Sequence, residues 1–214
     1  MFAKYTSFTN KTMGIKERKE REKEELRQKI LDAAAEILIS QGIEKCTIRK
    51  VAASIEYSPR TVYLYFKDKD HLLREIIEKG FEISVRQMTE TRKEFDYSNP
   101  RELISFQLRN NVNNALGAPN FYKAVVYLLH FKNYDPGPHQ EKLIEGVKLD
   151  IRKSYEALNM PAENIEAKTD QLFGFLRGFN LVIVNKKLKP GSPETEEFIE
   201  LGIDSMIDGI LKFP

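Results

Sequence analysis

The 214-residue sequence has one cysteine and three histidines, and both shortages exclude classes of function. A lone Cys46 cannot form an internal disulfide, which is typical of a protein in a reducing cytoplasm, and we interpret it as a small buried apolar residue. His71, His130 and His139 lack the spacing that a metal site needs. The sequence also has no glycine-rich phosphate loop, zinc-protease His pair or Gly-x-Ser-x-Gly turn. We therefore expect no enzymatic activity, no cofactor and no metal, although catalytic residues can converge from distant positions.

Long hydrophobic runs and a strong net charge are also missing. No apolar run could span a bilayer and the first dozen residues have no hydrophobic signal core, so we expect a soluble cytoplasmic protein. The net charge is only +2. Residues 1–70 contain 15 Lys and Arg against 11 Asp and Glu, which is +4, whereas the remainder has 19 against 21, which is −2. This asymmetry weakly favours DNA contact by the first third of the chain.

No stretch shows the alternation of a β-strand, and helical periodicity with Gly and Pro punctuation predicts an all-α chain of about nine helices. The expected domains are a disordered tail over residues 1–15, a helix-turn-helix domain over 16–70 and an effector-binding and dimerisation domain over 71–214. A long helix from Lys69 to about Phe95 should join the last two. The other expected helices cover residues 16–42, 47–55, 58–66, 100–116, 121–131, 139–158, 162–187 and 193–213.

The stretch from Thr47 to Lys69 contains the strongest functional signal. Thr47 is a good N-cap, and the apolar residues after it recur at helical spacing on one face: Ile48, Val51, Ala52 and Ile55. Ser58 and Pro59 then open a second helix of about two turns. In that helix Pro59, Val62 and Phe66 should face inward, with Arg60, Thr61 and Leu64 opposite and Tyr63 and Tyr65 at the boundary.

A two-turn helix is not stable alone, so an exposed face that combines a cation, a hydroxyl and phenols suggests a function. A helix-turn-helix DNA reader needs this arrangement, because its second helix enters the major groove. The alternative is an ordinary helical hairpin whose Arg, Thr and Tyr side chains are merely solvated.

Residues 43–72 resemble the DNA-binding signature of the TetR (tetracycline-repressor) family of bacterial transcriptional regulators. The resemblance rests on Thr-Ile-Arg at 47–49, Ala52, the Ser-x-x-Thr-Val-Tyr-x-Tyr-Phe run from Ser58, and the Lys-Asp pair before Leu72. It implies a dimer that binds a palindromic double-stranded DNA operator and is released by a small molecule, with repression as the usual mode. By the same resemblance, Arg49 and Thr61 match DNA-contact positions and Lys69 matches a phosphate contact.

The chemistry of the side chains gives each candidate DNA-binding residue a role. Arg49 and Arg60 suit base edges, because a guanidinium can bond both acceptors of guanine. Thr61 and Leu64 could touch a thymine methyl group, and Pro59, at the start of the helix, is a further candidate DNA-binding residue. The candidates for phosphate contact are Thr47, Ser58, Tyr63, Tyr65 and Lys69. The charged segment before them is either a solvated helix or a further phosphate contact through Lys16, Arg18, Lys19 or Lys23.

The stretch from Leu172 to Val184 is apolar nearly all round, so a helix there must be covered on several sides. We expect this helix and the last one to pair with their copies in a homodimer, as the resemblance also implies. The alternative is a helix in the core of one chain. The candidate interface residues are Gly174, Gly178, Leu181, Val182, Phe198, Leu201, Ile207 and Ile210.

The resemblance implies a small-molecule pocket among the C-terminal helices. The mixture of aromatic and polar residues there favours a lipophilic or aromatic effector. The candidates, each of which could also be plain core or surface, are Phe106, Asn110, Tyr122, Val126, Tyr127, His130, Phe173, Arg177 and Asn180. Two other classes remain open: a helix-turn-helix protein of another family, and a dimeric α-helical small-molecule-binding protein or enzyme without a DNA function.

Overall fold

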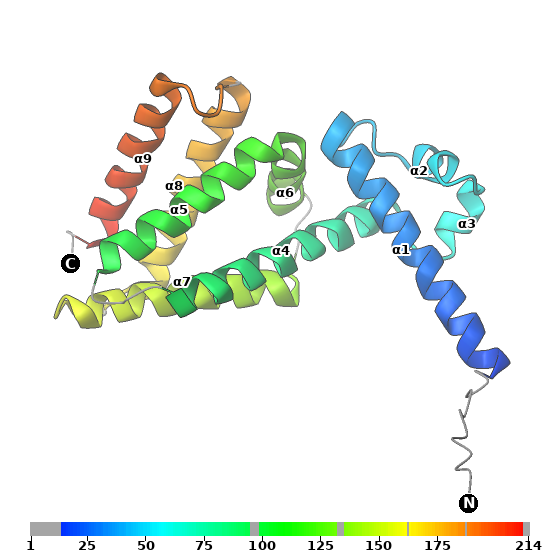
Figure 1. The fold of residues 1–214 in the computed structure, drawn as a ribbon, viewed down its shortest axis with the longest axis horizontal. Helices are drawn as coiled ribbons and strands as arrows, with labels where there is room; N and C mark the ends of the chain where they lie inside the picture. Colours follow the sequence, from blue (N-terminus) through cyan, green and yellow to red (C-terminus); the bar gives the residue numbers. More distant parts are fainter. Residues whose placement is uncertain (1–13, 95–98, 132–134, 162, 187, 212–214) are drawn as a thin grey trace, which may run out of the picture.

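The computed structural model describes residues 14–94, 99–131, 135–161, 163–186 and 188–211. The described residues form nine helices and no strand, as predicted. A small head of three helices lies at one end, and a larger helical body lies at the other (Figure 1). The predicted tail over residues 1–15 falls almost wholly outside the described residues, and its last residue, Ile15, begins the first helix.

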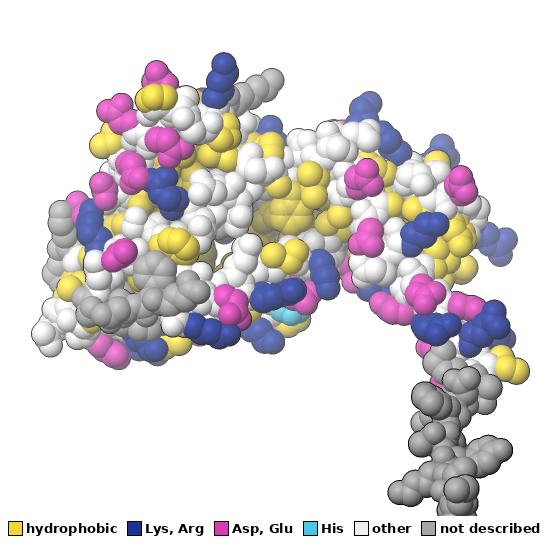
Figure 2. All heavy atoms as spheres, viewed as in Figure 1, with side chains coloured by type: hydrophobic (Ala, Val, Ile, Leu, Met, Phe, Trp, Pro, Cys, Tyr) yellow, Lys and Arg dark blue, Asp and Glu magenta, His cyan; other side chains and the backbone are white. Residues whose placement is uncertain are grey.

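The head consists of α1 (Ile15–Gln41), α2 (Ile48–Ser54) and α3 (Pro59–Tyr63). The predicted inner face of α2 is buried, since Ile48, Val51, Ala52 and Ile55 are all less than 9% exposed. Helix α1 ends where Gly42 adopts a φ of +85°, a conformation that glycine tolerates better than other residues. The first half of α1 projects beyond the head (Figure 1), with acidic and basic side chains intermixed along it (Figure 2).

Two helices connect the head to the body. Helix α4 (Lys69–Glu94) runs without a break through Gly80, and α6 (Pro119–Phe131) packs against α1 and α4. The buried core of the head includes Leu72 and Ile76 of α4 and Ala124 and Leu128 of α6. Packing is therefore continuous across residue 70, the predicted domain boundary.

The body consists of α4 with α5 (Pro100–Gly117), α7 (Pro138–Ala157), α8 (Ile165–Lys186) and α9 (Pro193–Leu211). A second buried core joins α5, α7, α8 and α9 and contains Tyr155, whose hydroxyl donates to the carbonyl of Ile210. Two arginines of α5 bind acidic side chains of α9: Arg101 contacts Asp204 and Asp208, and Arg109 contacts Glu196 and Glu200. The last helix is thus fixed along the body by apolar packing and by charge.

Most predicted helix boundaries lie within three residues of the observed ones, but the helix after Ser58 is shorter than predicted. It has five residues instead of about two turns, and the chain leaves it at Leu64 before Phe66 packs into the head. Pro59, which we expected on the inner face, is exposed. Among the described residues, no helix is both long and apolar enough to cross a membrane.

Candidate nucleic-acid interface and effector pocket

The outer surface of the head is built by local hydrogen bonds that fix two short helices. The Thr47 hydroxyl accepts from the backbone N–H of Lys50 at 3.3 Å, and the Ser58 hydroxyl accepts from that of Thr61 at 3.2 Å. These bonds satisfy N–H groups that a helix start leaves without partners. Val62 and Phe66 then anchor α3, since both are 0% exposed.

Anchoring on one side leaves the other side of α3 open. Arg60 is exposed, Tyr63 is 55% exposed and Leu64 is 75% exposed. The side chains of Tyr63 and Leu64 leave apolar surface in contact with water, and this surface adds nothing to the packing of the core. This arrangement leaves a guanidinium, a phenol and an apolar tip for a binding partner.

The remaining candidate DNA-binding residues fall into two groups. Arg49, Thr47 and Ser58 are exposed beside α3. Thr61 and Tyr65 are half-buried, with the Thr61 hydroxyl 3.0 Å from that of Ser58 and Tyr65 packed against the head core. Lys69 is also half-buried, because its ammonium donates to the carbonyl of Ile43 at 2.6 Å and so ties α4 to the loop after α1.

A groove beside α3 adds residues that the motif did not include. It is lined on α1 by Lys19, Lys23 and Lys29 together with Glu22, Glu25 and Leu26, and on the other side by Tyr57 and Tyr65. The Lys29 ammonium lies over the Tyr57 ring, 5.5 Å from its centre. The sequence signal for this groove was the basic leader. Lys29 and Tyr57 belong to the same groove because α1 packs against α2.

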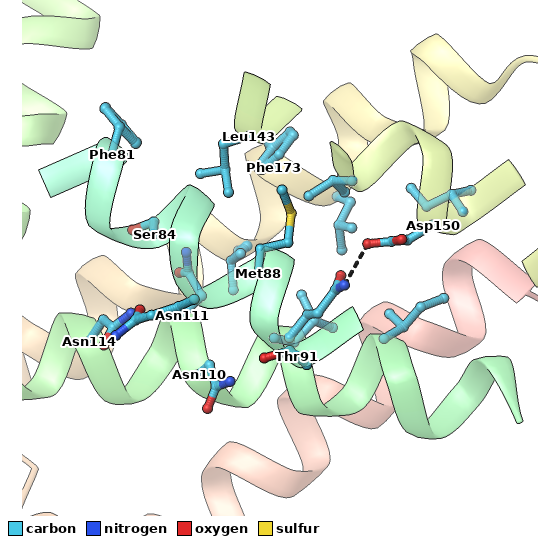
Figure 3. Close-up of a pocket in the computed structure, with 18 residues that line it drawn as sticks. Phe81, Ser84, Met88, Thr91, Asn110, Asn111, Asn114, Leu143, Asp150 and Phe173 are labelled. Atoms are coloured by element: carbon cyan, nitrogen blue, oxygen red, sulfur yellow. Dashed lines mark hydrogen bonds between the residues drawn. The ribbon is translucent and has the colours of Figure 1, made fainter. Parts of the chain in front are cut away.

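The body contains two neighbouring cavities that share lining residues. The first, of about 140 Å³, lies between α4, α5, α7 and α8, where the labelled side chains of Figure 3 converge. The second, of about 420 Å³, extends from it toward α6. Phe81, Ser84, Leu143 and Phe173 line both. The volume of the second cavity lies in the range of small-molecule sites.

The candidate pocket residues are only partly brought together. Asn110 and Phe173 line the first cavity, and Tyr122, Val126, Phe173 and Arg177 line the second. The Tyr122 hydroxyl donates to the carbonyl of Arg177 at 3.2 Å, and burial raises the pKa of this phenol. Asn180 is fully buried and donates to Asn111, which also lines both cavities.

Two candidate pocket residues lie elsewhere. Phe106 lines neither cavity and is 39% exposed, while Tyr127 packs against the core of the head because it is on the other side of α6. The side chain of His130 lies outside the described part of the structure. The sequence reading omitted α4 and α7, which contribute Phe81, Ser84, Met88, Leu143 and Asp150 (Figure 3).

A buried ion pair includes Asp150, which lines the first cavity (Figure 3). Asp150 is 0% exposed, and its carboxylate accepts from Arg92 at 2.8 Å and from Gln107 at 2.6 Å. Arg92 also donates to the carbonyl of Gly146. A buried carboxylate needs such partners because leaving water is costly for a charge. The cluster joins α4, α5 and α7 at the pocket.

The candidate dimer residues divide by burial. Ile207 is 0% exposed and Ile210 is 4% exposed, so both belong to the core of one chain and present no surface to a second. Phe198 is half-buried and stacks on Phe179 at 5.2 Å, and Leu181 is half-buried too. The four other candidates, Gly174, Gly178, Val182 and Leu201, are exposed.

The exposed candidates form an apolar surface on α8 and α9 with one residue that we did not predict. Phe175, next to Gly174, is 64% exposed, Leu201 is 63% exposed and Val182 is 41% exposed. Neither Gly174 nor Gly178 has a neighbour where a Cβ atom would stand. The apolar Leu172–Val184 stretch is therefore covered within one chain on some sides only. The surface defined by Gly174, Phe175, Gly178, Val182 and Leu201 is hereafter the α8–α9 surface.

Comparison with known families assigns the head. Residues 30–76, which run from the middle of α1 to the first part of α4, match the family of bacterial regulatory proteins described as tetR. The head of the chain matches the tetR family. The matched range contains α2, α3 and their buried contacts. The resemblance noted from the sequence is thus confirmed.

A curated relative supports the assignment of the head. It is an uncharacterised HTH-type transcriptional regulator of Haemophilus influenzae, 30% identical over 78 residues. The match covers 36% of this chain and 40% of the relative, so it concerns less than half of either protein.

Solved structures resemble the chain over most of its length. RolR in complex with resorcinol has a TM-score of 0.63 at 17% identity, with 87% of this chain and 88% of that chain covered. The transcriptional regulator FadR from Bacillus subtilis in complex with stearoyl-CoA has a TM-score of 0.65 at 14% identity, covering 87% and 99%. A TetR from Streptomyces coelicolor has 0.62 at 16% identity, covering 86% and 96%. At these identities the likeness concerns the fold.

Proposed function

We propose that the protein is a ligand-responsive transcriptional regulator, and by default a repressor, that binds a palindromic DNA operator as a homodimer. The observation that carries this proposal is α3, a capped five-residue helix that is anchored by the fully buried Val62. Arg60 and Tyr63 of this helix and Leu64, which follows it, are exposed. A helix held in this way can enter the major groove without losing its own support.

The proposed roles on DNA follow from exposure. Arg60 and Arg49 are free to reach base edges, where a guanidinium can bind guanine in a bidentate manner. Leu64 would contact a thymine methyl group, and Thr61 would do so only with its half-buried methyl. Thr47, Ser58, Tyr63, Tyr65 and Lys69 would bind phosphates and fix the register, with the α1 lysines of the groove as further phosphate contacts.

The α8–α9 surface supports the homodimer. A monomer gains nothing from an exposed Phe175 and Leu201 beside two glycines that leave room for another helix. Two-fold pairing of this surface would bring two copies of α3 into one dimer. Such a dimer would recognise half-sites about one helical turn, or a multiple of it, apart.

Helix α6 supports coupling between an effector and DNA. One side of it, with Phe121, Tyr122 and Val126, lines the larger cavity, and the other side, with Ala124 and Leu128, belongs to the core of the head. Asn120, near its start, donates to the carbonyl of Ile39 in α1 at 3.0 Å. A ligand that shifts α6 or α4 must therefore disturb the head.

The effector would act by binding one dimer geometry better than another. The favoured geometry would be one in which the two α3 helices no longer match successive major grooves. The cavity walls are largely apolar with several amides, which supports a lipophilic or aromatic effector. RolR with resorcinol and FadR with stearoyl-CoA are precedents for small-molecule binding in this fold.

Lys69→Ala tests the phosphate contacts. We expect it to weaken binding to every duplex alike and to reduce the slope of log K against log salt by about one unit, because one counterion fewer is released. The measurement is fluorescence anisotropy with a labelled duplex at several salt concentrations. Lys142→Ala, which removes an exposed lysine of α7, is the matched control and should change nothing. An unchanged slope for Lys69→Ala would contradict the assignment.

The proposed function is tested by the same titration of the intact protein. Binding that weakens steeply with salt, and that is abolished by a molecule which also raises the melting temperature, is the expected result. If protein freed of bound ligand shows no salt-sensitive DNA binding, the proposed function is contradicted. The alternative, a small-molecule-binding protein without a DNA function, then remains.

A further inference from the structure

Gln140 is a buried polar side chain with no hydrogen-bond partner for its oxygen. It lies in the first turn of α7 and is 9% exposed, and it lines the larger cavity. Its Oε1 atom is inaccessible to solvent and accepts no hydrogen bond from the described residues. A buried polar atom without a partner lowers stability by about 1 to 3 kcal/mol, so a reason for its presence is needed.

Helix capping does not explain Gln140. A glutamine at the third position of a helix often bonds back to the residue before the helix. In α7 the residue before the helix is Gly137, and Glu78 of α4 binds the helix start instead. The Glu78 carboxylate accepts from the backbone N–H of His139 at 2.6 Å and contacts the imidazole of His139 at 2.8 Å. The helix start therefore gives the glutamine oxygen no partner, and Gln140 is one of the residues that line the larger cavity.

The charges around the larger cavity balance. Among the described residues that line it, the charged ones are Arg177 and Asp170, which have opposite signs and lie seven positions apart on α8. The other polar residues that line it are neutral: Ser84, Asn111, Asn114, Tyr122 and Gln140. In the adjoining cavity the Asp150 carboxylate is already paired with Arg92. The lining therefore has no net charge, which favours an uncharged ligand over an ion that must leave water.

From these observations we propose that Gln140 selects the effector, which is an uncharged molecule with an apolar body and a hydroxyl or amide head group. The head group bonds the Gln140 amide, and the body lies against the apolar wall, which includes Phe81, Phe121, Val125, Leu143 and Phe173. This inference rests on the proposed function of the cavity as the effector site. A hydroxyl or an amide suits glutamine because each can both donate and accept.

A series of five probes with one body tests the head group. They are 4-butylphenol, 4-butylbenzamide, butylbenzene, 4-butylbenzoate and 4-butylbenzylammonium, measured at neutral pH by displacement of the uncharged fluorophore N-phenyl-1-naphthylamine from the full-length protein. The phenol and the benzamide should bind about 3- to 10-fold more tightly than butylbenzene, the gain from one net hydrogen bond. Both charged probes should bind more weakly than the phenol.

Gln140→Leu should reduce the preference for the phenol over butylbenzene to within about twofold while butylbenzene binds as before. Gln87→Leu, the same change at an exposed glutamine that lines only the smaller of the two cavities, should keep the preference. In the ligand-free protein, Gln140→Leu should raise the melting temperature by about 2 to 4 °C, because an unpaired amide is removed.

Several results would overturn the inference. For the wild-type protein, these are tightest binding by a charged probe or no binding by any probe. For Gln140→Leu, they are an unchanged preference for the phenol over butylbenzene, or a lower melting temperature, which would show that Gln140 has a structural role. The same preparation is assayed for salt-sensitive DNA binding. Intact DNA binding with a failed probe series rejects the ligand class alone, and lost DNA binding with a successful series rejects the regulator alone.

Discussion

Replacing Arg92 with methionine is expected to lower the free energy of unfolding by about 3 to 5 kcal/mol. The variant leaves the Asp150 carboxylate, whose side chain is 1% exposed, without its cationic partner. Methionine keeps much of the volume of the arginine stem, so the loss reports on charge and hydrogen bonding more than on packing. The measurement is urea unfolding followed by circular dichroism at one fixed protein concentration, because the stability of a dimer depends on concentration.

Two further variants identify the cause of that loss. Arg86→Met breaks a surface pair with Glu82 in the same helix, where the arginine side chain is 67% exposed, and it should cost less than about 1 kcal/mol. The double variant Arg92→Met with Asp150→Leu should recover most of the stability, because no unpaired charge remains. If Arg92→Met is no more destabilising than Arg86→Met, the ion pair does not hold α4, α5 and α7 together.

Val182→Glu should convert the proposed dimer to a monomer. Two-fold symmetry places two new carboxylates in one interface, and burying them unpaired should raise the dimer dissociation constant by two orders of magnitude or more, or about 3 kcal/mol. Binding to a palindromic duplex should fall with it, since each monomer then holds one half-site. Sedimentation of the protein alone and anisotropy with DNA measure the two effects.

Leu149→Glu is the matched control for this experiment. Leu149 on α7 has the same exposure as Val182, 41%, and lies outside the α8–α9 surface. It should leave both the dimer and the DNA affinity unchanged. A wild-type protein that sediments as a monomer at tens of micromolar, or a dimer that dissociates with Leu149→Glu and not with Val182→Glu, would contradict the assignment of the interface.

Local signals allowed the head to be predicted almost completely. Thr47 and Ser58 are caps that bond within three residues, and Ile48, Val51 and Ala52 repeat at the helical period. Such features are encoded in short stretches, so a sequence reader can find them without knowing the neighbours. The predicted length of α3 was too great because Phe66 lies four residues after Val62, which is the spacing of a helix. In the structure the helix ends before Phe66.

The pocket could be predicted only in part because its residues meet across long separations. Arg92 and Asp150 are 58 positions apart, and no local pattern shows that they pair. In the sequence, Gln140 follows Gly137-Pro138 and could cap its own helix. Only the position of Glu78 in the structure shows that α4 supplies the cap instead.

The buried and exposed apolar residues of α9 could not be told apart either, because periodicity marks Ile207 and Leu201 alike as apolar positions. Whether each packs within the chain or remains exposed depends on the placement of α5 and α8.

The most direct test of the central claim is selection from a random duplex library by the intact, ligand-stripped protein at about 150 mM salt, repeated with Arg60→Ala. We predict a palindrome with half-sites about one or two helical turns apart. Arg60→Ala should lose about 1 to 3 kcal/mol on that sequence and relax the preference at one position in each half-site. Enrichment of no sequence, or equal loss by the variant on all sequences, would contradict recognition of DNA by the exposed face of α3.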